Sequence, residues 1–142
     1  GLQPLVESLA AEGYTFEVET NGTIAPTPGM LRHIEQWNVS PKLRTSGNLL
    51  SETLNPLALQ TFAALPDAYF KFVIAVESDV DEVCTLRDQY KLAPERILLM
   101  PEGRTPDALA KKSAWLLELC VQHGFRFTTR LHIILWGDER GR

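Results

Sequence analysis

Residues 69–76 read Tyr69-Phe-Lys-Phe-Val-Ile-Ala-Val76, and this nearly continuous apolar run is the strongest strand pattern in the chain. Aromatic and β-branched residues favour strands. A strand without regular polar alternation is typical of a parallel sheet that is covered on both faces. The run therefore predicts one strand of a covered parallel sheet.

Helix and strand patterns alternate on both sides of this run. Further strands are expected at 14–19, 37–40, 96–100, 125–127 and 131–136, and helices before Gly13 and at 27–36, 55–65, 78–90 and 105–123, with a polar loop at 43–54. Thr-Pro and Asn-Pro pairs mark helix starts, and Gly124 marks a helix end. The alternation predicts the fold class α/β, with a mainly parallel sheet and alternating helices. We expect residues 1–142 to form a single domain.

The composition is that of an ordinary globular protein, with 44% hydrophobic and 23% charged residues. A net charge of −4 argues against binding nucleic acid through a broad basic surface. No apolar run approaches the length of a membrane span, and no export signal opens the chain. Cys84 and Cys120 stand alone within helical patterns, which suggests apolar packing in a reducing, cytoplasmic setting.

Three polar clusters follow predicted strands, where open α/β proteins bind their ligands. They are Glu19-Thr-Asn-Gly-Thr23, Ser40-Pro-Lys42 and Met100-Pro-Glu-Gly103. Each cluster taken singly is a common turn or strand end, as with Asn21-Gly22. Together they suit a small polar ligand that bears an amine, a carboxylate and hydroxyls. In this interpretation Glu19 accepts from ribose hydroxyls or an amine, and Lys42 pairs with a ligand carboxylate.

Other chemistry leaves no clear pattern in the sequence. There is no Gly-rich phosphate loop and no Gly-x-Ser-x-Gly elbow. The histidines at 33, 123 and 132 lack the spacing of metal ligands. The acidic residues at 79, 81 and 82 are interpreted as favourable charge at a helix N-terminus.

The tail from Arg130 to Arg142 brings an imidazole, an indole and arginines to the end of a predicted strand, Leu131 to Trp136. That position suits a ligand site. The alternative is an edge strand with a solvated or disordered tail.

Four segments occur in order: Glu19-Thr-Asn-Gly-Thr23, Ser40-Pro-Lys42, Leu99-Met-Pro-Glu-Gly103 and Leu131-His-Ile-Ile-Leu-Trp-Gly-Asp-Glu-Arg-Gly-Arg142. In this order and spacing they resemble the C-terminal two-thirds of the 7-carboxy-7-deazaguanine synthase family. The resemblance covers essentially all 142 residues. It implies part of an incomplete (β/α) radical S-adenosylmethionine (SAM) barrel that pairs as a homodimer.

The family resemblance also implies an activity. Its members are radical SAM lyases that convert 6-carboxy-5,6,7,8-tetrahydropterin to 7-carboxy-7-deazaguanine with loss of ammonia, in queuosine and 7-deazapurine biosynthesis for tRNA modification. S-adenosyl-L-methionine, a four-iron four-sulfur (4Fe-4S) cluster and Mg²⁺ serve this reaction. The implied partner is the small pterin substrate, not nucleic acid or a membrane.

Site residues follow from the same resemblance. The implied SAM-binding residues are Ser40, Pro41, Lys42, Met100, Pro101, Glu102 and Gly103, together with Glu19 and Asn21. Gln is common in the family where this chain has Met100, and a thioether cannot replace an amide. His132 matches a position on the substrate side, and Arg142 matches the residue that closes over the pterin.

The family's three-cysteine cluster loop and its Gly-Gly-Glu-Pro segment are not in this sequence. Cys84 and Cys120 are too far apart to replace that loop, and a cluster needs thiolate ligands. We expect the ligands of the cluster and of Mg²⁺ in a segment before Gly1, and the chain alone to be inactive. Two alternatives remain open: a non-catalytic SAM- or nucleotide-binding module, and a truncated barrel that serves mainly as a dimer interface.

Two orientations can be predicted. Lys71 interrupts a buried-looking strand, and an unpaired buried ammonium is costly. We therefore expect Lys71 to pair with a carboxylate or to point into the barrel mouth, the alternative being a solvated start of the strand. In the predicted last strand, His132, Ile134 and Trp136 share the inward face, and Ile133 and Leu135 pack outward. Arg140 or Arg142 then supplies charge for the substrate carboxylate.

Overall fold

The computed structural model describes residues 1–47 and 54–139. The elements in chain order are α1 (Gln3–Ala11), β1 (Phe16–Thr20), α2 (Pro28–Leu31), β2 (Ile34–Val39), η1 (Arg44–Ser46), α4 (Pro56–Ala63), β3 (Ala68–Ile74), α5 (Ser78–Tyr90), η2 (Pro94–Arg96), β4 (Ile97–Pro101), α6 (Pro106–His123), β5 (Arg126–Phe127) and α7 (Leu131–Trp136). Part of the loop expected at 43–54 lies outside the described residues.

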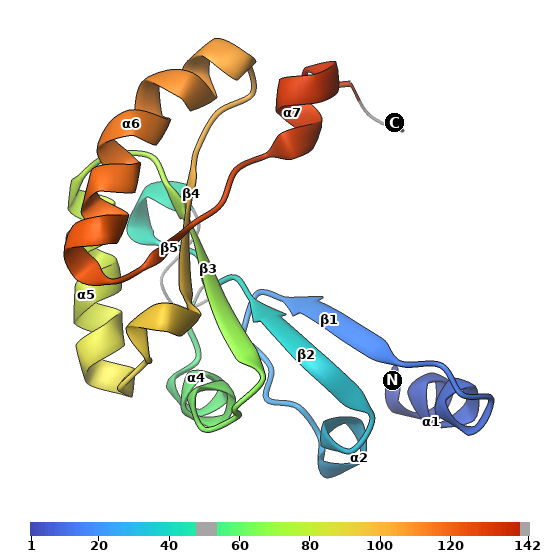
Figure 1. Ribbon diagram of the computed structural model, residues 1–142. Coiled ribbons are helices and arrows are strands. Elements are labelled where there is room, and N and C mark those ends of the chain that lie inside the picture. The colour runs from blue at the N-terminus through green and yellow to red at the C-terminus, as the bar shows by residue number, and fades with distance from the viewer. Residues whose placement is uncertain (48–53, 140–142) are drawn as a thin grey trace.

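The strands form one parallel five-stranded sheet in the order β1-β2-β3-β4-β5. Each strand pairs with the next in the chain, and β1 and β5 are the two edges, so the sheet stays open (Figure 1). The fold class predicted from the sequence is confirmed. Since the connections step steadily in one direction, the arrangement is that of an incomplete β/α barrel.

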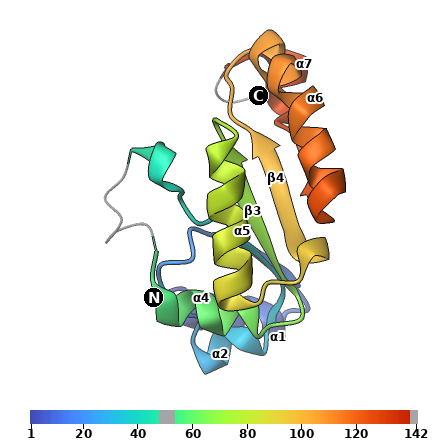
Figure 2. The same ribbon diagram turned by 90° about the vertical axis from the view of Figure 1, so that its left-hand side faces the viewer.

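Only one face of the sheet is covered in the described structure. Helices α4, α5 and α6 lie on the same face (Figure 2), and they bury Phe70, Phe72 and Ile74 of β3 completely. The alternate residues Tyr69, Lys71 and Val73 are half-buried. The expectation of cover on both faces is therefore wrong, because long aromatic and aliphatic side chains supply apolar character even on the open side. That open side is called the inner face below. Its residues are Glu17, Glu19, Gln36, Asn38, Tyr69, Lys71, Val73, Leu98, Met100 and Arg126.

The long helix α6 forms as its sequence predicts. The hydroxyl of Thr105 accepts from the Ala108 N–H at 3.2 Å, and Pro106 occupies the first turn. Gly124 ends the helix with a φ of 71°, a left-handed conformation that glycine adopts without steric cost. In residues 1–47 and 54–139, no helix has the length and apolarity to cross a membrane.

Two elements differ from the sequence prediction. The helix expected at 27–36 ends at Leu31, and strand β2 already begins at Ile34, because the apolar side chains of Ile34, Trp37 and Val39 enter the core. Residues 131–136, predicted as a strand, form the helix α7. A short apolar run has no period that separates a helix from a strand, and the backbone here closes an Ile133 O to Gly137 N bond of 2.9 Å.

Candidate functional site

The inner face opens into a cleft of about 320 Å³ beyond the carboxyl ends of β1 to β4. Its lining residues are Glu19, Thr20, Asn21, Asn38, Ser40, Lys42, Lys71, Val73, Met100 and Arg130. This is the edge at which a parallel sheet presents ligand sites. Five of the residues that the resemblance assigns to SAM binding therefore share one cleft: Glu19, Asn21, Ser40, Lys42 and Met100.

The turn after β1 shapes one wall of the cleft. The Asn21 amide oxygen accepts from the Thr23 N–H at 3.1 Å and from the Thr23 hydroxyl at 2.7 Å. Gly22 has a φ of 76°, and a Cβ there would lie 2.8 Å from Cγ1 of Val39. The positive φ and this close approach both favour glycine at position 22.

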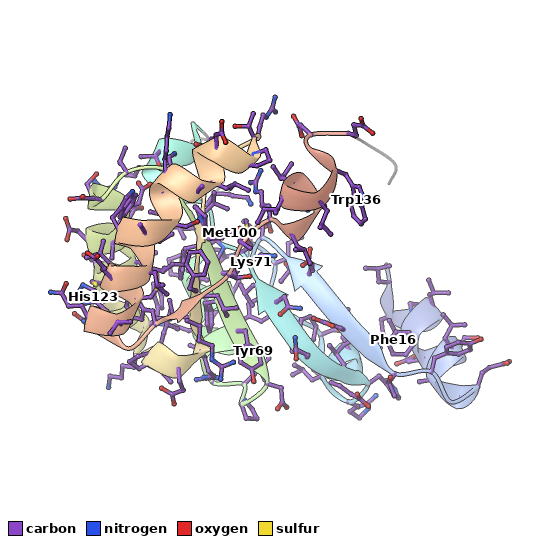
Figure 3. All side chains as sticks on the ribbon, turned by 45° about the horizontal axis from the view of Figure 1, so that its top comes forward. Phe16, Tyr69, Lys71, Met100, His123 and Trp136 are labelled. Carbon is purple, nitrogen blue, oxygen red and sulfur yellow. The ribbon has the colours of Figure 1, made fainter. Side chains whose placement is uncertain are left out.

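Lys71 points into the cleft from β3 and pairs with a carboxylate, as expected from the sequence. Its Nζ lies 3.2 Å from Oε1 of Glu19, and the side chains are 28% and 76% exposed. Figure 3 shows Lys71 and Met100 together in the middle of the molecule. The pair brings an ammonium and a carboxylate to the cleft centre but contributes little to stability, because Glu19 is largely solvated.

The segment after β2 is held by two further contacts. The Ser40 N–H donates to the Thr20 carbonyl at 2.7 Å, which places Ser40 and Lys42 at the cleft. Farther along, the Thr45 hydroxyl donates to Oδ1 of the buried Asp79 at 2.9 Å. Pro41 is buried and lines a smaller adjoining cavity of about 70 Å³.

Of the cluster Met100 to Gly103 at the end of β4, only Met100 lines the main cleft. Glu102 faces the adjoining cavity and accepts from Nζ of Lys112 at 2.8 Å, and this hydrogen bond lowers the pKa of the Glu102 carboxyl. Pro101 and Gly103, at and just after the end of β4, are buried. A Cβ at Gly103 would lie 3.0 Å from Leu109, so this glycine lets helix α6 approach the strand end closely.

Arg130 is a cleft residue that the sequence interpretation did not assign. Its Nη1 donates to the Gly103 carbonyl at 3.4 Å, and its side chain is half-buried. A signal was present, since Arg130 follows β5 as the polar clusters follow the other strands. Arg130 was overlooked because residues 131–136 were predicted to be a strand, which placed the expected end of the last strand after Trp136. Thr20, Asn38 and Val73 were also not assigned.

The tail does not adopt the predicted orientations. His132 is exposed on α7 and is absent from the cleft lining. Ile133 is the buried residue of this helix, at 1% exposure, whereas Ile134, Leu135 and Trp136 are exposed. Figure 3 shows Trp136 on the outside of the molecule. In a helix successive side chains are 100° apart, so the strand alternation cannot hold. Arg140 and Arg142 lie outside the described residues.

Both cysteines lie in helices on the covered face of the sheet. Burial raises the pKa of Cys120 to about 11 and also raises that of Cys84, whose Sγ lies 3.6 Å from Nδ1 of His123. In the described ranges, no three His, Cys, Asp or Glu side chains are grouped so that they could hold a metal ion. The packing role expected for these thiols suits this setting.

No protein-family model matches the chain. A 7-carboxy-7-deazaguanine synthase of Pyrobaculum aerophilum is 37% identical over 142 residues, which is 100% of this chain and 61% of that protein. The synthase of Halobacterium salinarum is 35% identical over 94% of this chain and 59% of its own length. That of Hyperthermus butylicus is 32% identical over 94% of this chain and 58% of its own length.

The chain is a relative of these synthases. The family resemblance drawn from its motifs is thereby confirmed, and the relatives are named as enzymes. The chain spans about 60% of the length of the curated synthases that it matches. In the fold, the aligned part contains the cleft and all the strands that line it.

Proposed function

We propose that this chain is the greater part of a 7-carboxy-7-deazaguanine synthase, a radical SAM lyase that converts 6-carboxy-5,6,7,8-tetrahydropterin to 7-carboxy-7-deazaguanine with loss of ammonia. The observation that carries this proposal is the 37% identity over all 142 residues to a protein of that name. The product belongs to queuosine and 7-deazapurine biosynthesis, a cytoplasmic pathway, and we propose a homodimer as the assembly.

The cleft chemistry fits S-adenosylmethionine. Glu19 offers a carboxylate for ribose hydroxyls or an amine, Ser40 a hydroxyl, and Lys42 an ammonium for the amino-acid carboxylate. Val73 and Met100 supply apolar surface between these polar groups. The volume of about 320 Å³ is near the lower end for small-molecule pockets.

The chemistry that the cofactor supplies is reductive cleavage of S-adenosylmethionine at the 4Fe-4S cluster. In this proposal, the described residues bind and orient the ligands in the open half of the barrel. Lys71 holds the Glu19 carboxylate at the cleft through their 3.2 Å contact. The hydrogen bonds from Thr23 hold Asn21 at the edge of the same site.

The described cysteines do not fit the cluster. Cluster ligands are thiolates, and burial raises the pKa of both Cys84 and Cys120 on the face opposite the cleft. We therefore assign the ligands of the cluster and of Mg²⁺ to sequence outside this chain, which alone is expected to be inactive. A non-catalytic SAM-binding module is the alternative that this distribution of cysteines favours.

Analysis of the full-length gene product separates these functions. Anaerobic purification should give four iron and four sulfide per chain, as expected for one 4Fe-4S cluster, and the protein should form 7-carboxy-7-deazaguanine from the carboxypterin. A protein that binds S-adenosylmethionine but has no cluster would support the non-catalytic module instead.

The cleft assignment has its own test. Lys42→Ala should weaken S-adenosylmethionine binding about tenfold, as expected for loss of one charged hydrogen bond. Lys111→Ala, an exposed position on α6, is the matched control and should have no effect. Equal affinity of the Lys42 variant and the control would remove Lys42 from the cofactor site.

A further inference from the structure

We infer that Arg130 selects the substrate by its carboxylate, which it binds through two parallel N–H···O bonds. The inference rests on the proposed function, because it assigns the carboxypterin and the cofactor to one cleft. It replaces the expectation that Arg140 or Arg142 fills this role.

The first step is the pairing of cations around the cleft rim. Most of them already have a carboxylate: Lys71 pairs with Glu19 at 3.2 Å, Lys112 with Glu102 at 2.8 Å, and Arg104 with Asp138 at 3.7 Å. In residues 1–47 and 54–139, no carboxylate lies within salt-bridge distance of Lys42 or Arg130. These two cations are therefore available to ligand anions.

The second step is the match between these cations and the ligands. S-adenosylmethionine and the carboxypterin each carry one carboxylate, so the proposed reaction brings two carboxylates into the cleft. Lys42 follows β2, an inner strand, whereas Arg130 follows the edge strand β5, and strands β3 and β4 lie between them. Lys42 lies in the segment that resembles a SAM-binding motif, so Arg130 is left for the pterin.

The third step is the geometry of the guanidinium. The Gly103 carbonyl accepts one of its N–H groups at 3.4 Å and holds the half-buried side chain against the wall after β4. A guanidinium has five N–H donors in a rigid fork that matches a carboxylate. Since one donor is used by the wall, enough remain for a bidentate contact, which a flexible lysine ammonium cannot make.

The fourth step is the charge of the cleft. Its lining includes three cations, Lys42, Lys71 and Arg130, but one carboxylate, Glu19. The chain as a whole has a net charge of −4. The positive cleft therefore stands out from the rest of the molecule and attracts anionic ligands.

The experiment measures binding to the full-length gene product by anaerobic calorimetry. The probes are 6-carboxytetrahydropterin, tetrahydropterin without the carboxylate, and S-adenosylmethionine. Arg130→Gln should weaken binding of the carboxypterin by about 10- to 100-fold, as for loss of a charged bidentate contact. The affinities of the Arg130→Gln variant for tetrahydropterin and for S-adenosylmethionine should change less than about twofold. Arg130→Lys should recover only part of the loss, because it keeps the charge but not the fork.

Arg104→Gln is the matched control, since Arg104 is on the same rim but outside the cleft lining. It should bind all three probes like the wild type. The inference is overturned if Arg130→Gln weakens both pterins equally, or if it weakens S-adenosylmethionine alone, which would give the contact to the cofactor. A wild-type protein that binds neither pterin contradicts the proposed function itself. Circular dichroism shows whether each variant folds. If Arg130→Gln does not fold, Arg130→Lys is used to test the inference instead.

Discussion

Asp79 is the residue that ties the candidate site to the core. It is 1% exposed, and its carboxylate accepts the N–H groups of Ala75 and Val76 at 2.7 and 3.1 Å and the Thr45 hydroxyl at 2.9 Å. The sequence suggested only favourable charge at a helix start. In the structure this buried carboxylate joins the end of β3 to the segment that follows Lys42.

The first prediction is that Asp79→Ala lowers the free energy of unfolding by about 3 kcal/mol, because two backbone N–H groups and one hydroxyl lose the buried carboxylate that accepts from them. Thr45→Val removes one of the three bonds and should cost about 1 kcal/mol. Urea denaturation of both variants measures these values. If Asp79→Ala is as stable as Thr45→Val, the hydrogen bonds from the backbone to Asp79 do not contribute to the free energy of unfolding.

Glu102 provides a prediction on pH. The hydrogen bond from Lys112 lowers the pKa of Glu102 in the folded protein. A lowered folded pKa stabilises the protein above the ordinary carboxyl pKa, and that contribution is lost as the pH falls through the folded value. The energy is small because Glu102 is half-exposed. Lys112→Met should therefore raise the Glu102 pKa towards its ordinary value, which an NMR titration of the carboxyl carbon would detect. An unchanged titration would mean that the pair does not form in solution.

At the scale of elements, α7 shows where a local pattern fails. The run Leu131 to Trp136 contains residues that favour strands, and six residues are too few for a period to decide between the two structures. Tertiary packing decides between helix and strand here. One side chain, Ile133, is buried, and the helix places the other apolar residues on its exposed side.

The third prediction distinguishes the two structures of this segment. In the helix, Ile133 is 1% exposed and Ile134 is 47% exposed. Ile133→Ala should cost about 2–4 kcal/mol of unfolding free energy, and Ile134→Ala less than about 1 kcal/mol. Thermal and chemical denaturation of the two variants give the comparison. The reverse order of stabilities would restore the strand, in which Ile134 shares the inward face.

At the scale of the whole molecule, the sequence predicts what depends on chain order and local chemistry. The parallel α/β sheet follows from alternating elements, the bounds of α6 from Thr105-Pro106 and Gly124, and the Lys71 ion pair from the cost of a buried ammonium. The part that could not be predicted depends on which strand ends meet. Arg130 joins Lys42 because β5 and β2 belong to one curved sheet, and no local pattern encodes that distance.

The same architecture separates stability from binding on the two faces of the sheet. Phe72 and Lys71 are neighbours on β3, but Phe72 is fully buried under the helices and Lys71 enters the cleft. Phe72→Ala removes a large core side chain and should cost about 3–5 kcal/mol, which is much of the stability of a small domain. Lys71→Ala breaks an ion pair with a solvated partner and should cost less than about 1 kcal/mol.

Ligand binding should reverse that order. Phe72→Leu, a milder core change, should keep the affinity for S-adenosylmethionine once the protein is folded, because the helix-covered face does not touch the cleft. Lys71→Ala should weaken that binding, since Glu19 loses the ammonium 3.2 Å away that holds it at the cleft centre. Calorimetry on the full-length gene product, paired with urea denaturation of the same samples, gives both quantities. If the Phe72 variant loses affinity while Lys71→Ala retains it, the two faces are coupled through the strand, and the open face is not an independent binding surface.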